Sequence, residues 1–244
     1  MRAVGIIPSR LESTRLPRKA LIDIDGLPMI VHVFKRTALS DALDEVYVAT
    51  DSEVIFDIVT RHGGHALMTS DGHRTGTDRI AEAASHIDAD IIVNIQGDEP
   101  LLNPRHIGEV VAPLQNDPTV QVAVLVSPFT ARNRLAVIKA VLDQRSDILY
   151  CSRNDLPSSA RVDVGQMWKM SFIVPFRKDF LLRYASWDQS PLERIEFNEY
   201  LRILEHGFKI RAVPVAQVHI SVDTYDDLRL VRDTMKTDSV RERY

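Results

Sequence analysis

Residues 3–19 read AVGIIPSRLESTRLPRK, and this stretch determines how the rest of the chain is interpreted. The apolar run 3–7 indicates a short buried strand. A loop follows it, with three Arg and one Lys within ten residues, interleaved with Ser and Thr. Open α/β sheets bind ligands beyond the carboxyl ends of their strands, and cationic and hydroxyl groups bind phosphate oxygens. The stretch therefore predicts a site for an anion, above all a triphosphate, in preference to a solvated basic loop.

Strands alternate with helices through residues 1–130. Apolar runs indicate further strands at 45–51 and 91–95, and helical spacing of apolar residues indicates helices at 29–38 and 52–62. Thr77 is the expected N-cap of another helix. This alternation predicts an α/β fold with a doubly wound, mainly parallel sheet.

Residues 131–244 are less regular and predict a smaller irregular lobe. Within it, Ser190-Pro191 is expected to open one long helix that runs to Glu205. The charged residues after 235 are expected to fray. Because no repeat or linker interrupts the sequence, we expect a single domain over 1–244, divided into the halves 1–130 and 131–244.

Composition narrows the class of protein. The chain has 244 residues, of which 45% are hydrophobic and 26% charged, and its net charge is -4. These values predict a globular protein that binds neither nucleic acid nor anionic membranes. The single cysteine, Cys151, excludes an internal disulfide and predicts a packing residue. No segment has the length of a membrane span, and we expect a cytoplasmic protein.

Two aspartates are candidate metal ligands. Asp98 follows the strand 91–95, at the same end of the sheet as the basic loop if the strands are parallel, and Asp223 precedes the last helix. Two carboxylates beside a triphosphate suit Mg²⁺, a hard cation that binds one or two Asp together with phosphate oxygens. The alternatives are a turn residue for Asp98 and a helix cap for Asp223. The histidines form no i, i+4 pair, so a zinc site is not expected.

The sequence resembles the 3-deoxy-manno-octulosonate (Kdo) cytidylyltransferases, also called CMP-Kdo synthetases. The resemblance extends over nearly the whole chain and implies a fold of the nucleotide-diphospho-sugar transferase type. It also implies a homodimer that couples CTP to an anionic sugar acid with Mg²⁺ and releases pyrophosphate. The matching segments are 5–10 (GIIPSR), 13–17 (STRLP), Lys19, 28–30 (PMI), 48–51 (VATD), 75–79 (TGTDR), 93–100 (VNIQGDEP) and 190–193 (SPLE).

The resemblance also implies roles for individual residues. Catalysis would rest on Lys19, Arg10 and Asp98, with Asp98 and Asp223 as metal ligands. The half 1–130 would bind the nucleotide and the half 131–244 the acceptor and the second subunit. The residues implied to bind the nucleotide are Pro8, Arg10, Ser13, Thr14, Lys19, Ala49, Asp51, Arg74, Thr75, Gly76 and Gln96. The residues implied to bind the acceptor are Gln96, Ser152, Arg153, Met170, Val174, Glu199 and Tyr200.

The acceptor half departs from the family pattern. Met170, Val174 and Tyr200 stand where relatives have His, Tyr and Gln, and Arg18 replaces the Gly of Leu-Pro-Gly-Lys. Loss of hydrogen-bonding groups predicts that the acceptor has changed and that Kdo is a poorer substrate than a related acid. The alternative is that these residues have drifted while Kdo is still the acceptor. Arg153 would then grip the acid group. Two other functions are considered. One is cytidylyl transfer to a different acceptor, such as an amino- or deoxy-sugar acid or a phosphonate. The other is nucleotide binding without catalysis.

Overall fold

A computed structural model describes residues 1–13, 15–218 and 220–244. The chain forms two compact units, which are Met1–Gly108 with His219–Tyr244, and Glu109–Val218. Helix α4 (Pro104–Asn116) contains the boundary between them. The predicted division at residue 130 therefore differs from the division into units, and the single-domain organisation stays a prediction.

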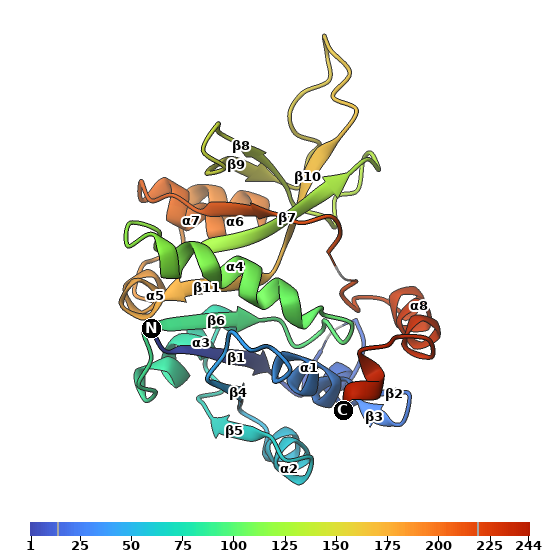
Figure 1. The fold of residues 1–244 in the computed structure, drawn as a ribbon. Helices are drawn as coiled ribbons and strands as arrows, with labels where there is room; N and C mark the ends of the chain where they lie inside the picture. The colour runs from blue at the N-terminus through green and yellow to red at the C-terminus, as the bar shows by residue number, and fades with distance from the viewer. Residues whose placement is uncertain (14, 219) are drawn as a thin grey trace. The chain divides into compact units, whose positions relative to one another are not determined.

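The first unit is built on a parallel sheet, as predicted. Its strands lie in the order β6 (Ile91–Ile95), β1 (Ala3–Ser9), β4 (Glu45–Thr50) and β5 (His65–Met68). From β1 the chain moves outward to β4 and β5, and then returns to place β6 on the other side of β1 (Figure 1). The strand order thus reverses between β1 and β6. Such a switch point is where open α/β sheets bind ligands.

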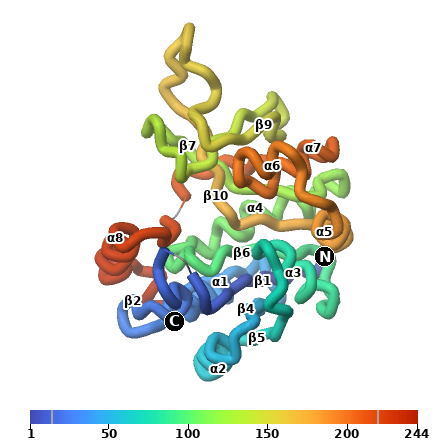
Figure 2. The backbone as a smooth tube through the Cα atoms, turned by 180° about the vertical axis from the view of Figure 1, so that it is seen from behind, coloured from blue at the N-terminus to red at the C-terminus, as the bar shows by residue number. Residues whose placement is uncertain are grey.

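Helices and a small hairpin complete the first unit. The last long helix, α8, lies beside the hairpin formed by β2 and β3, as both views show (Figures 1 and 2). The bounds are β2 Asp23–Ile24, β3 Leu27–Pro28, α1 Met29–Thr37, α2 Glu53–Arg61, α3 Gly76–Ser85 and α8 Tyr225–Met235, with short 3₁₀ turns η1 Lys19–Leu21 and η2 Arg241–Arg243.

An apolar core anchors α8 to the start of the chain. Leu16 and Ile24 pack with Val222, Leu228 and Val231, and all five are buried. Burial of such side chains contributes about 1.5–3 kcal/mol each. This core holds residues 220–224, including Asp223, against the loop that follows β1.

The N-cap of helix α3 lies two residues before the predicted cap, Thr77. Thr75 is the N-cap and accepts from the Asp78 amide at 3.1 Å, while the Asp78 carboxylate accepts from the Thr75 amide at 3.1 Å. This reciprocal capping box satisfies two amides that the helix itself leaves unpaired. Thr77, the predicted cap, is buried inside the helix, where its hydroxyl accepts from Asn94 at 3.3 Å.

The second unit contains a mixed sheet of five strands in the order β12, β7, β10, β8 and β9. The helices α6 and α7 lie beside β9 (Figure 2). The bounds are β7 Ala123–Phe129, β8 Lys139–Leu142, β9 Ile148–Ser152, β10 Met167–Ser171, β11 Ile173–Arg177, β12 Arg211–Pro214, α5 Lys178–Ala185, α6 Pro191–Glu196 and α7 Tyr200–Glu205.

The single long helix predicted over 191–205 is wrong. The chain leaves the helical conformation at Phe197, whose φ is +48°. That left-handed turn lets the buried Asn198 donate to Cys151 Sγ on β9 at 3.1 Å. The result is two short helices, α6 and α7, packed against the sheet.

The C-terminal residues are not frayed. Tyr244 bonds through its hydroxyl to His32 Nδ1 at 2.7 Å, and Arg36 forms an ion pair with Asp238. The other ring nitrogen of His32 lies 2.6 Å from the Ile24 carbonyl. The fraying prediction was wrong because these tertiary bonds fix a segment that looks disordered from its charge alone. Among the described residues, no helix combines the length and apolar character needed to cross a membrane.

His32 makes stability depend on pH. Burial lowers the pKa of His32, with the positive charges of Arg241 and Arg36 acting in the same direction and the Ile24 carbonyl and Asp25 opposing them. The unfolded chain therefore binds a proton at a higher pH than the folded chain, so the stability due to this group is present above about pH 6.5 and is lost below it. Between pH 7.5 and 5.5, the melting temperature of the wild type should fall more steeply than that of His32→Gln. Parallel curves would contradict this account.

Arg18 occupies a backbone conformation that suits glycine. Its φ and ψ are 52° and 38°, in the left-handed region, which costs an L-residue about 1–2 kcal/mol. Glycine loses about 0.5–1 kcal/mol more backbone entropy on folding. Arg18→Gly should therefore raise the free energy of unfolding by about 0.5–1 kcal/mol in urea titrations. Arg18→Ala keeps the Cβ and is the control; equal stability of the two variants would contradict the backbone explanation.

Candidate active site

Three predicted site segments converge on Pro8, the residue that ends the apolar run of β1. A Cβ added at Gly97 would lie 3.0 Å from the Pro8 carbonyl oxygen, and one added at Gly76 would lie 3.1 Å from Pro8 Cγ. The loops after β1 and β6 and the start of α3 therefore approach each other too closely for larger residues. This places the predicted nucleotide-binding loops together at the switch point of the sheet.

Lys19 and the two predicted metal ligands form one cluster. Lys19 Nζ donates to Asp98 Oδ2 at 2.7 Å, to the Val222 carbonyl at 2.7 Å and to Asp223 Oδ1 at 3.5 Å. Arg15 Nη2 lies 2.8 Å from the same Asp223 oxygen. The Val222 amide donates to the Asp98 carbonyl at 2.9 Å, which joins the two acidic segments through the backbone. Residues far apart in sequence thus meet at one point.

The environment of Asp98 is partly buried and charged. Burial raises the pKa of Asp98 above its ordinary value, while the Lys19 ammonium opposes this shift. The neighbouring Glu99 is buried and accepts from the Ser221 hydroxyl at 3.2 Å. A carboxylate held in such surroundings is stabilised by a cation beside it.

The cluster suits a divalent cation that also binds phosphate. Both carboxylates lie within 3.5 Å of one ammonium nitrogen, so a single positive charge is shared by two hard oxygen donors. In the part of the chain that the structure describes, no group of three or more His, Cys, Asp or Glu could hold a metal. Two carboxylates without a third ligand fit Mg²⁺, which usually retains waters and takes its other oxygens from phosphate.

The side chain of Asp51 is fixed by a residue to which the sequence analysis gave no role. Arg79 Nη2 donates to Asp51 Oδ2 at 2.7 Å, and Arg79 Nη1 donates to the Thr69 hydroxyl at 2.6 Å. Arg79 is buried in α3. Its two hydrogen bonds connect α3 to the residues that follow β4 and β5. The motif 75–79 contains Arg79, but no local pattern indicates its partner; Arg15 was missed for the same reason.

The remaining predicted nucleotide residues lie around these fixed groups. Arg10 and Arg74 are exposed on their loops, and Ser13 is partly exposed. Gln96 donates to the buried Asn94 side chain at 3.2 Å. Ala49 is buried in β4. Thr14 lies outside the described residues.

Arg153 does not have the free guanidinium expected of an acid-binding residue. Its Nε donates to the Glu196 carbonyl at 3.0 Å, Nη1 to the Leu135 carbonyl at 3.2 Å, and Nη2 to the Phe197 carbonyl at 3.1 Å. Ser152 donates to the Glu196 carboxylate at 2.7 Å. Three of its nitrogens bind backbone carbonyls here, and the role of Arg153 at an acceptor carboxylate stays a prediction.

The three substituted acceptor positions are buried. Met170, Val174 and Tyr200 expose 2%, 0% and 3% of their surface. The Tyr200 ring stacks on Phe172 with 5.7 Å between centroids, and the carbonyl of Glu199 accepts from the Tyr184 hydroxyl at 2.8 Å. In this conformation these side chains form part of the interior, and their contact with an acceptor stays a prediction.

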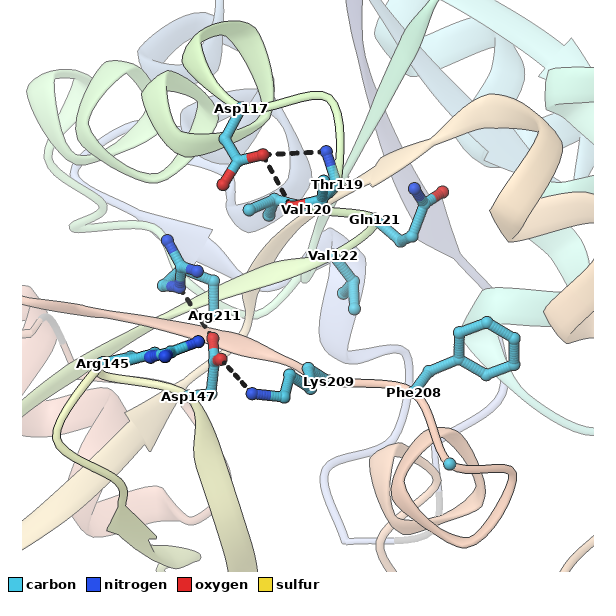
Figure 3. A pocket seen from close by; sticks show the side chains of 11 residues that line it. Asp117, Thr119, Val120, Gln121, Val122, Arg145, Asp147, Phe208, Lys209 and Arg211 are labelled. Carbon is cyan, nitrogen blue, oxygen red and sulfur yellow. Dashed lines mark hydrogen bonds and ion pairs between the residues drawn. The ribbon is translucent and has the colours of Figure 1, made fainter.

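A cavity of about 500 Å³ in the second unit lies apart from the predicted residues of that unit (Figure 3). Asp147 accepts from Lys209 at 2.9 Å and from Arg211 at 2.7 Å. Asp117 accepts from the Thr119 amide and hydroxyl. These carboxylates of the cavity thus accept hydrogen bonds from other residues that line it. Among the described residues, the cavity lining includes none of the predicted nucleotide or acceptor residues.

The chain is similar to known cytidylyltransferases. The family model described as cytidylyltransferase matches residues 4–210. The chain is 44% identical to a 3-deoxy-manno-octulosonate cytidylyltransferase of Geobacter metallireducens, over 93% of this chain and 95% of the relative. A protein of the same name from Chlorobium limicola is 41% identical over 99% of this chain and 100% of the relative.

Solved structures show the same fold. A CMP:2-keto-3-deoxy-manno-octonic acid synthetase complexed with CTP has a TM-score of 0.92 and 37% identity, covering 97% of this chain and 99% of that one. A 4-diphosphocytidyl-2C-methyl-D-erythritol synthase from Anaerococcus prevotii, at 12% identity and a TM-score of 0.66, covers 96% of this chain and 98% of its own and shares the fold alone. The chain belongs to the cytidylyltransferase family, among the 3-deoxy-manno-octulosonate cytidylyltransferases.

Proposed function

We propose that this protein transfers a cytidylyl group from CTP to Kdo, with Mg²⁺, to give CMP-Kdo and pyrophosphate. The observation that carries the proposal is the Lys19–Asp98–Asp223 cluster at the switch point of a nucleotide-binding sheet. A protein that only bound a nucleotide would not need both carboxylates beside the phosphate-binding loop. The identity of the acceptor rests on the full-length similarity to the Kdo enzymes.

The chemistry requires position and charge more than a covalent nucleophile. Asp98 and Asp223 would hold Mg²⁺, which when bound stabilises charge on phosphate oxygens and favours loss of the proton from the acceptor hydroxyl. Lys19, Arg10, Ser13 and Thr14 would bind the triphosphate and orient its α-phosphorus for in-line attack. The other groups proposed to bind CTP are Pro8, Ala49, Asp51, Arg74, Thr75, Gly76 and Gln96.

The acceptor is proposed to be Kdo itself. Apolar or aromatic residues stand at positions 170, 174 and 200, and burial of Met170, Val174 and Tyr200 supports packing in place of altered recognition. Gln96, which is partly exposed, remains a proposed acceptor contact. Roles for Ser152 and Glu199 in acceptor binding stay predictions.

A cytoplasmic homodimer is the proposed form of the enzyme. Phe197, Leu135 and Leu149 in the second unit are 82%, 61% and 62% exposed. Arg153 binds the carbonyls of both Leu135 and Phe197, which keeps these two apolar residues close together. Exposed apolar groups of this kind often mark contacts between proteins. Light scattering of the wild type and of Phe197→Asp would test the dimer; a monomeric wild type would contradict it.

Release of pyrophosphate tests the function directly. With Mg²⁺, CTP and Kdo together should release pyrophosphate, whereas reactions without Kdo, or with ATP, GTP or UTP in place of CTP, should release little. Detection of CMP-Kdo by mass spectrometry identifies the product. Equal release with ATP, or release that does not require a sugar acid, would contradict the proposal.

A further inference from the structure

The acidic pair Asp98–Asp223 is already neutralised by two of the chain's own cations. The Lys19 ammonium has three acceptors within hydrogen-bond distance, which are Asp98 Oδ2, the Val222 carbonyl and Asp223 Oδ1. An ammonium has three N–H groups, so none remains for a phosphate. Arg15 adds a second positive charge at Asp223 Oδ1.

The loop that carries these two cations is also the proposed triphosphate site. Lys19 and Arg15 both lie on the basic loop after β1, and the proposed function places Lys19 on the phosphate. Lys19 therefore cannot hold the acidic pair and the phosphate with the same N–H groups. A divalent cation on Asp98 and Asp223 would compete with Lys19 for the same oxygens, because two positive charges at one point repel each other.

We propose that Lys19, assisted by Arg15, is an exchangeable counter-ion that keeps divalent cations off Asp98 and Asp223 until a nucleotide draws both side chains to its phosphates. The inference rests on the proposed function for the location of the triphosphate. CTP and the metal then bind with positive coupling, since the nucleotide removes the cations that exclude the metal. By linkage, the metal strengthens nucleotide binding by the same factor.

The side chains favour such an exchange. Lys19 has a flexible four-carbon stem, and its side chain is largely buried, whereas that of Arg15 is two-thirds exposed. Lys19 contacts both carboxylates and Arg15 only one, so Lys19 should exclude the metal more strongly. Arg18, the adjacent cation, is exposed, and no contact with either carboxylate is found among the described residues.

Metal titration without nucleotide tests the exchange. Mn²⁺ binding is measured by electron paramagnetic resonance for the wild type, Lys19→Met, Arg15→Met and Arg18→Asn. Each variant removes one positive charge, and Asn at position 18 also tolerates the left-handed backbone. We expect affinity for Mn²⁺ to rise by about tenfold or more in Lys19→Met, by less in Arg15→Met, and not at all in Arg18→Asn. Asp98→Asn in the Lys19→Met background should abolish the gain.

Two results would overturn the proposal. One is Mn²⁺ affinity in Lys19→Met equal to or weaker than that of the wild type. The other is an equal rise in all three single variants, which would reflect net charge alone. If Lys19→Met does not fold by circular dichroism, the exposed Arg15→Met decides the question, because its affinity must still exceed that of Arg18→Asn. Pyrophosphate release by the wild type is scored separately, so failure of the exchange and failure of the cytidylyltransferase function are distinguishable.

Discussion

Asp98→Asn should lower kcat for CMP-Kdo formation by about 10²- to 10³-fold or more, the loss expected when one preorganised electrostatic group is removed. The amide keeps the size of the carboxylate but loses the charge that would hold Mg²⁺ beside the triphosphate. The amide oxygen can still accept from the Lys19 ammonium, so we expect the variant to fold. Its melting temperature, measured in the same samples, separates a loss of kcat from a loss of fold.

Asp88→Asn is the matched control for this measurement, since the Asp88 side chain is fully exposed. It should retain wild-type kcat. A value of kcat for Asp98→Asn within about threefold of the wild type at saturating Mg²⁺, well below the loss expected for such a group, would make Asp98 a structural residue.

Glu193→Ala should lower the free energy of unfolding of the second unit by about 3–5 kcal/mol, the cost of leaving one buried charge unpaired. Glu193 accepts from Arg202 Nε at 2.7 Å and from Arg202 Nη2 at 2.6 Å, and both side chains are 4% exposed. The remaining Arg202 contacts, to the Trp187 carbonyl at 2.9 Å and over the Tyr184 ring at 5.0 Å, do not replace the lost carboxylate. Both tryptophans, Trp168 and Trp187, lie in this unit, so fluorescence during urea unfolding reports on it.

Two further variants separate charge from side-chain loss. Glu109→Ala removes an exposed glutamate in the same unit and should change stability by less than about 0.5 kcal/mol. Glu193→Leu combined with Arg202→Met should recover much of the stability, because apolar pairs of similar volume often replace buried ion pairs without loss. A double variant as unstable as Glu193→Ala would contradict the charge explanation.

The switch point of the first unit could be predicted from sequence because its elements carry strong local signals. The strands β1 and β6 are mostly apolar, and Asp98 follows β6 as the basic loop follows β1. Parallel strands bring such segments to one edge. The convergence of Asp223 with Asp98 was expected only as a metal pair, and the Lys19 ammonium between them was not foreseen.

Other features depend on contacts between distant residues, which sequence patterns do not encode. Helical spacing continues through Phe197, so nothing local marks the break that lets Asn198 reach Cys151. The sequence around an arginine such as Arg153 does not show whether its guanidinium binds a ligand or backbone carbonyls. Tyr244 looks like part of a charged tail, yet its hydroxyl bonds to His32. In each case the tertiary structure decides the role.

The acceptor that we propose differs from the sequence expectation for the same kind of reason. The sequence suggested that hydrogen bonds to sugar hydroxyls are lost at Met170, Val174 and Tyr200. In the structure all three are buried, and Tyr200 stacks on Phe172. Replacements in an interior change packing first, which supports unchanged recognition of Kdo.

The value of kcat/KM for Kdo, measured with CTP and Mg²⁺ beside a panel of other sugar acids and phosphonates, tests the central claim most directly. We predict that Kdo has the highest value of the panel and reaches the ordinary enzyme range of about 10⁴ M⁻¹s⁻¹ or more. A value for another acceptor at least about tenfold higher than for Kdo, a preference of about 1.4 kcal/mol in transition-state binding, would contradict it.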